Sequence, residues 1–192
     1  MDLVPTPSQT AGPYFHLGMT DTRSVPQIAG PQTKGERVWL TCRLVDGDDA
    51  PVCDAVIEIW QADAEGKYNH PDNVRNRIQS RDPSWLGFGR MPTALDGCCE
   101  FETIRPGRVL GLGNEPQAPH LNMAIFARGL LKQLYTRIYF AGDPSNAEDA
   151  VMKLVTPERR ETLLAQPDPA QPSRWRFDIH LQGEMETVFF DV

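Results

Sequence analysis

Residues 37–45 read RVWLTCRLV, a stretch that alternates apolar and polar side chains with the two-residue period of a β-strand. One face of this strand carries four apolar residues, Val38, Leu40, Cys42 and Leu44. The same alternation recurs near the carboxyl end in residues 175–183, which read WRFDIHLQG. Both stretches therefore predict strands that turn one face toward a hydrophobic core.

Further strand patterns occupy the region between these two stretches and the end of the chain. They cover residues 55–63, 98–104, 120–127, 133–140 and 186–192. Glycine and proline separate the patterns, and helical periodicity is scarce. About seven short strands with few helices predict an all-β fold, namely a β-sandwich of two mainly antiparallel sheets.

The remaining segments are expected to form an arm, loops and one or two short helices. Residues 1–36 indicate an extended N-terminal arm that packs on its own domain and on a partner subunit, with residues 37–192 forming the sandwich. Residues 64–95 are polar and irregular, and a loop of that length is commonly functional. The stretch from Ser145 to Ala165 is the best helical candidate, and Thr156-Pro157-Glu158 resembles a helix start.

Composition narrows the function classes. The chain has 192 residues and a formal net charge of −7, which argues against a nucleic-acid partner. The four cysteines form no C-x-x-C pair, a pattern typical of reduced thiols in the cytosol. The sequence contains no signal peptide or transmembrane pattern, so a cytoplasmic protein is expected.

Three residues are candidates for chemistry, and spacing alone leaves each of them open. His120 begins a strand pattern, but Asn122 stands where a second histidine would share its face; His120 alone fits either a ligand or a hydrogen-bonded structural histidine. Tyr68 supplies a hard phenolate donor suited to ferric iron, or a loop hydrogen bond. Arg128 ends a strand pattern and fits either a carboxylate clamp or a solvated arginine.

Several segments together resemble one family, the intradiol ring-cleavage dioxygenases. They are TPSQTAGPYFHLG (6–18), EIWQADAEGKY (58–68), the Pro-Gly pair at 106–107, APHLNMAIFARG (118–129), LYTRIYF (134–140) and RFDIHLQGEMETVFFD (176–191). Each segment is a weak signal, whereas their combination is specific and spans nearly the whole chain. The resemblance implies a β-sandwich core and a non-haem ferric centre.

The same resemblance implies that the metal site of this chain is incomplete. Iron-bearing members of the family use two tyrosines and two histidines as ligands. Tyr68 and His120 match one ligand of each kind, whereas Val109 and Asn122 stand at the other two positions. Gln117 replaces an arginine that assists ring attack. The departures favour a non-catalytic subunit with vestigial ligand positions.

The resemblance further implies an alpha-beta hetero-oligomer in which Fe(III) is held by an iron-bearing beta subunit. Similar alpha chains offer a tyrosine and an arginine to the substrate pocket on that partner, and Tyr14 and Arg128 match them. Arg128 is expected to attract the carboxylate of a small aromatic substrate. Two alternatives remain open: a purely structural subunit that stabilises its partner, and a stand-alone binding module. The latter needs an aromatic platform, which 8% aromatic residues do not make evident.

Overall fold

The structure is a computed structural model that describes residues 6–21, 23–70 and 84–191. Its main sheet contains the strands β1 (Arg37–Val45), β2 (Val56–Gln61), β3 (Phe88–Pro92), β4 (Cys98–Ile104), β7 (His120–Phe126), β8 (Leu134–Phe140), β9 (Leu164–Pro167) and β10 (Arg174–His180). A small ribbon is formed by β5 (Val109–Leu110) and β6 (Pro116–Gln117). The fold is therefore mostly β, as the alternating patterns predict.

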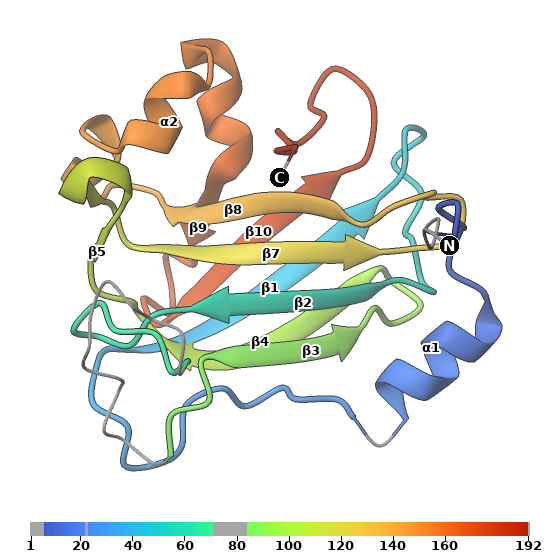
Figure 1. Cartoon of the computed structure of the whole chain (residues 1–192), viewed down its shortest axis with the longest axis horizontal. Coiled ribbons are helices and arrows are strands. Elements are labelled where there is room, and N and C mark those ends of the chain that lie inside the picture. Colours follow the sequence, from blue (N-terminus) through green and yellow to red (C-terminus); the bar gives the residue numbers. More distant parts are fainter. Residues whose placement is uncertain (1–5, 22, 71–83, 192) are drawn as a thin grey trace, which may run out of the picture.

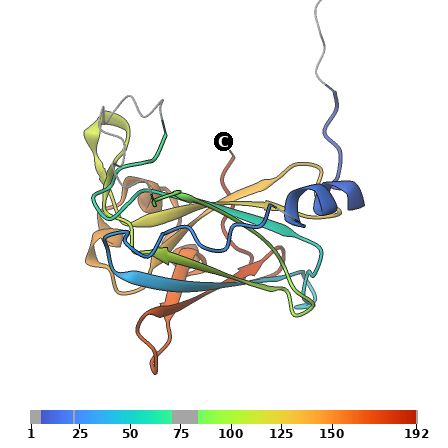
Figure 2. The same cartoon turned by 90° about the horizontal axis from the view of Figure 1, so that it is seen from below.

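The strands form one continuous sheet rather than two separate ones. Their order is β3-β2-β7-β8-β9-β10-β1-β4, and the sheet folds over so that β2, β7 and β8 face β1 and β10 (Figures 1 and 2). The two edge strands, β3 and β4, lie close together, so the sheet is nearly closed. Most neighbours are antiparallel, but the pairs β1–β10 and β8–β9 are parallel. The expected two antiparallel sheets thus become a mixed sheet, because β9 hydrogen-bonds to both halves.

The hydrophobic core lies between the two halves of the sheet. The four apolar residues that alternate along β1 are at most 1% exposed, which confirms the face predicted for this strand. Phe177 and Ile179 of β10 are buried in the same core, as the second quoted stretch predicts. Ile28 joins them from the N-terminal segment and is fully buried.

The N-terminal segment is not extended throughout. The helix α1 spans Pro13–Thr20, and proline at the start of a helix is favourable because its missing N–H has no partner there in any case. Beyond α1 the chain runs along the sheet and makes single β-bridges through Val25, Gln27 and Ala29. The second half of this segment therefore packs on its own domain.

The helical region is divided into short pieces: η2 (Pro144–Ala147), α2 (Ala150–Leu154) and η3 (Pro157–Leu163), with η1 (Leu112–Asn114) elsewhere. The start at Pro157 is confirmed, but one helix over 145–165 is wrong, because proline cannot continue a helix from the preceding turn. None of the helices that the described residues form is long and apolar enough to cross a membrane.

Two other expectations differ from the structure. Residues 186–192 were expected to form a strand, but among the described residues only Phe190 bridges to Tyr135 of β8. The segment 64–95 contains the strand β3, which pairs with β2 along its length. The rest of that expected loop falls partly on residues 71–83, which lie outside the described residues.

Candidate functional site

The position of Tyr68 is set by a tight turn that follows β2. The Asp63 carboxylate accepts hydrogen bonds from the backbone N–H groups of Glu65 and Lys67, both at 2.9 Å. The Asp63 carbonyl accepts one from Gly107 at 2.8 Å, so the turn packs on the segment that leads to β5. Tyr68 follows directly and is half-buried.

Gly66 makes this close packing possible, and replacing it by alanine is expected to cost about 2 kcal/mol of folding free energy. Its φ is 78°, and an added Cβ would lie 2.0 Å from the Arg108 carbonyl oxygen. Urea unfolding measures the loss. Gly142→Ala is the matched control, because Gly142 has φ of 80° but nothing within 4 Å of an added Cβ. Equal losses in the two variants would contradict the packing argument.

Val109 and Gln117 are paired across the β5–β6 ribbon, where their Cα atoms are register partners. Val109 is buried and offers no donor atom. The Gln117 side-chain oxygen accepts a hydrogen bond from Arg137 Nη1 at 3.2 Å. The ribbon thus brings the second vestigial position toward β8.

His120 and Asn122 lie on one face of β7, as the strand period predicts. His120 is 3% exposed, and its Nδ1–H donates to the Ala118 carbonyl at 2.8 Å. Asn122 Nδ2 donates to the Tyr68 hydroxyl at 3.4 Å. The structure therefore brings Tyr68 and Asn122 into contact and places His120 on the same strand.

Arg137 on β8 lies next to several of these residues. It is the cross-strand partner of Asn122, and its Nη1 also donates to the Tyr139 hydroxyl at 3.4 Å. The described residues give Arg137 hydrogen bonds to Gln117 and Tyr139. Its position opposite Asn122 depends on strand register, which the sequence does not show.

Asp149, which the sequence analysis missed, is hydrogen-bonded to Tyr139 and to the backbone next to His120. Its carboxylate is fully buried and accepts from the Tyr139 hydroxyl at 3.0 Å and from the Ala118 N–H at 2.8 Å. It also caps α2 through the N–H groups of Val151 and Met152. An aspartate before a short helix signals the cap, whereas its reach to Ala118 follows from tertiary structure alone.

Burial is the largest cause of the pKa shifts of Tyr68, Tyr139 and His120. Burial raises the pKa of Tyr68 and of Tyr139, so both phenols stay protonated at neutral pH. Burial, and after it the nearby charge of Arg137, lower the pKa of His120 to about 4. His120 is therefore neutral at physiological pH, and Arg137 carries the positive charge beside it.

The residues present do not fit a ferric ion. Ferric iron prefers hard anionic donors, but Val109 has no donor and the Asn122 amide is neutral. Asn122 also donates a hydrogen bond to the Tyr68 hydroxyl, and the positively charged Arg137 is its cross-strand partner. Within the described ranges, no three histidine, cysteine or acidic side chains come together in a way that could hold a metal.

Tyr14 and Arg128 lie elsewhere, at the opposite end of β7. His120 begins β7 and Arg128 lies two residues beyond its last residue, Phe126, a span of roughly 25 Å at about 3.3 Å per residue. Figure 1 shows β5 near the first end of β7 and α1 near the second. Tyr14 is 88% exposed, and the Arg128 side chain is 80% exposed with an ion pair to Asp54 at 3.1 Å.

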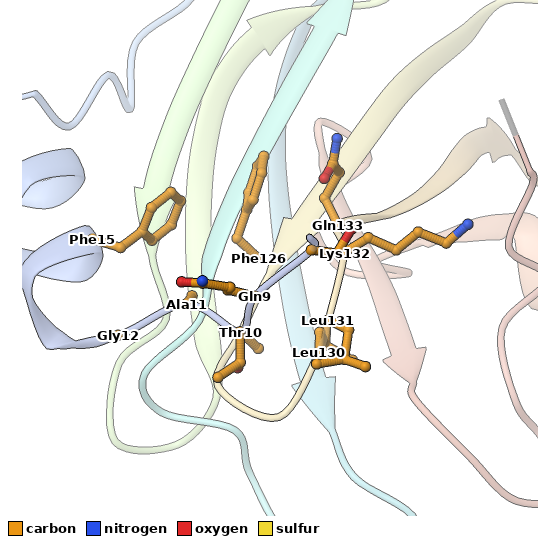
Figure 3. A pocket seen from close by; sticks show the side chains of 12 residues that line it. Gln9, Thr10, Ala11, Gly12, Phe15, Phe126, Leu130, Leu131, Lys132 and Gln133 are labelled. Atoms are coloured by element: carbon orange, nitrogen blue, oxygen red, sulfur yellow. The ribbon is translucent and has the colours of Figure 1, made fainter. Parts of the chain in front are cut away.

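A pocket of about 370 Å³ occupies this second end of the molecule (Figure 3). The rings of Phe15 and Phe126 lie 5.4 Å apart, and Thr10 Oγ1 accepts a hydrogen bond from the Gly129 N–H at 2.7 Å. Thr10 is thereby held against the loop between β7 and β8. Neither Tyr14 nor Arg128 lines this pocket.

The comparisons with known proteins agree with the fold. The family model described as Dioxygenase matches residues 10–183, and the chain belongs to the intradiol ring-cleavage dioxygenase family, whose members are non-haem iron enzymes. Within the family, it is 40% identical to the protocatechuate 3,4-dioxygenase alpha chain of Pseudomonas putida, over 100% of this chain and 98% of that one.

Two further relatives extend the comparison. The protocatechuate 3,4-dioxygenase beta chain of Burkholderia cepacia is 33% identical and matches 80% of this chain and 67% of its own length. The solved dioxygenase domain of a carbohydrate-binding fusion protein from Streptomyces sp. SirexAA-E superimposes with a TM-score of 0.62 at 26% identity, covering 96% of this chain and 100% of that domain. The chain is thus similar to both kinds of subunit, with higher identity to the alpha chain quoted above.

Proposed function

We propose that this chain is the alpha subunit of a protocatechuate 3,4-dioxygenase and works with an iron-bearing beta subunit. The assembled enzyme opens the protocatechuate ring between its two hydroxyl groups with O2, giving 3-carboxy-cis,cis-muconate. Fe(III) on the beta subunit supplies the activation of the ring toward oxygen. The cytoplasm is the location we infer for the complex, and residues 1–36 are the arm that contacts the partner.

One observation carries this proposal. The chain matches a protocatechuate 3,4-dioxygenase alpha chain over its full length, yet it has Asn122 near the start of β7 and Val109 in the β5–β6 ribbon. A chain with a family fold and no complete donor set needs an iron site supplied by another chain. The separate beta chain among the relatives is a suitable source.

The contribution of this chain to the shared pocket is proposed to come from Tyr14 and Arg128. Both side chains are exposed at the end of the molecule that is remote from the vestigial positions. Among the described residues, Arg128 has one ion-pair partner, the exposed Asp54, so its guanidinium is available to a substrate carboxylate. Tyr14 offers a hydroxyl from the first turn of α1.

Arg128→Ala in the reconstituted alpha-beta enzyme is expected to raise the Michaelis constant for protocatechuate by about 10- to 100-fold, the size of a lost charge-assisted hydrogen bond. Steady-state kinetics on the assembled complex measure the change. The matched control is Arg176→Ala, which removes another exposed arginine paired with an aspartate, Asp178, at 2.9 Å. Unchanged kinetics in intact complex would sink the assignment of Arg128.

The second candidate function is a purely structural subunit. The observation in its favour is that neither Tyr14 nor Arg128 lines the pocket of about 370 Å³ next to Phe15 and Phe126. In that case Tyr14→Phe and Arg128→Ala would weaken assembly, measured by size-exclusion chromatography, while turnover of the remaining complex would not change.

A further inference from the structure

We propose that Arg137 takes the place of the metal charge in this chain and excludes a metal ion from the vestigial site. The missing ligands weaken metal binding at this site, and the positive charge of Arg137 opposes it further. It depends on family membership and on contacts within this chain, so it stands apart from the proposed pairing with a beta subunit.

The first support is the position of Arg137 among the four vestigial residues. It is the register partner of Asn122, and cross-strand partners on one face have Cβ atoms about 5 Å apart. Asn122 in turn contacts the Tyr68 hydroxyl at 3.4 Å. Arg137 is therefore a neighbour of Asn122, and through Asn122 it is linked to Tyr68.

The same relation holds for the other two positions. Arg137 Nη1 donates to Gln117, the register partner of Val109 in the β5–β6 ribbon. It also donates to Tyr139, which is the register partner of His120 and whose ring centroid lies 5.7 Å from that imidazole. Each vestigial residue is thus a direct neighbour of Arg137 or of a residue that Arg137 contacts.

The second support is that the guanidinium is held in place and stays charged. Tyr139 accepts from Arg137 and donates to the buried Asp149 carboxylate, so the hydroxyl has a defined orientation. A guanidinium does not lose its proton in proteins, and Arg137 has no ion pair among the described residues. A fixed positive charge beside the donor set repels a ferric ion.

Restoring ligands alone should therefore fail to restore metal binding. The test compares the full chain carrying V109Y/N122H with the same chain carrying V109Y/N122H/R137Q. Both are loaded with ferric iron and washed with a chelator. Iron per chain and the visible absorption of tyrosinate bound to ferric iron are then measured. The V109Y/N122H/R137Q variant is expected to retain at least about tenfold more iron than V109Y/N122H. Substitutions of residues next to metal ligands commonly change metal affinity by about 10- to 100-fold.

Two matched variants separate charge from shape. V109Y/N122H/R137K keeps the positive charge and should stay nearly free of iron. V109Y/N122H/R176Q removes an exposed arginine on β10 and should behave like V109Y/N122H. Equal iron content with and without Arg137, whether high or low, would overturn the proposal. So would loading of the R137K variant to the level of R137Q.

Circular dichroism and thermal melting establish that the compared variants are folded. If the tyrosine at position 109 disrupts the β5–β6 ribbon, the pair N122H and N122H/R137Q carries the same comparison with Val109 in place. A gain of retained iron on removing Arg137 supports the proposal in this pair, and no gain overturns it.

Discussion

Asp149→Ala is expected to lower the free energy of unfolding by about 3–5 kcal/mol, the largest effect of any single substitution proposed for this chain. The carboxylate is fully buried and accepts from the Tyr139 hydroxyl, from the Ala118 N–H and from the first turn of α2. Each buried donor left without a partner costs about 1–3 kcal/mol, and the lost helix cap adds about 1 kcal/mol.

Urea unfolding at neutral pH measures this loss. Glu148→Ala is the matched control, because Glu148 precedes Asp149 directly but its side chain is 71% exposed and forms an ion pair with the exposed Arg108 at 3.4 Å. We expect that control to change stability by less than about 1 kcal/mol. Asp149→Asn keeps one acceptor oxygen and should fall between the two. A loss for Asp149→Ala no larger than that for Glu148→Ala would refute the role of the buried carboxylate.

Acidification is expected to cost about 3 kcal/mol of stability through His120 alone, from a pKa of about 4 in the folded chain and 6.5 in the unfolded chain at about 1.4 kcal/mol per unit. The unfolded chain binds the proton more tightly. The free energy of unfolding therefore falls as the pH drops below 6.5, and the loss is complete below about pH 4. Burial is the first cause and the charge of Arg137 the second, against the Ala118 hydrogen bond and the Asp149 charge.

Unfolding curves at several pH values between 7 and 4.5 test this dependence. His120→Asn should flatten it in that window, because the group that titrates there is removed. Arg137→Gln should reduce it, because removing the positive charge brings the pKa of His120 closer to its ordinary value. An unchanged slope in His120→Asn would show that other groups cause the acid sensitivity.

Local patterns explain why much of the fold was predictable. The alternation in residues 37–45 and in 98–104 matches β1 and β4 residue for residue, because a strand with one buried face must alternate. The strand β3 was missed because Phe88–Pro92 contains glycine, arginine and proline and shows no clean alternation. The parallel pairing of β1 with β10 was missed because pairing partners distant in sequence leave no local signal.

The candidate site divides in the same way. Tyr68, His120, Asn122 and Val109 were identified by sequence segments that resemble a family. Arg137 and Asp149 were not identified as members of the site. Their roles depend on the register of β7 against β8 and on the packing of α2 beneath β6, which no local pattern encodes.

The sequence by itself determined most of the strands and their buried faces, and it predicted the vestigial ligand positions, because side-chain period and residue identity are local properties. Only the tertiary structure decided that one mixed sheet joins the two halves, that Tyr14 and Arg128 lie at the far end of β7, and that Arg137 sits among the vestigial positions. These features depend on strand order, register and the packing of distant segments. They are set by the shared burial of the core and by hydrogen bonds between residues far apart in the chain.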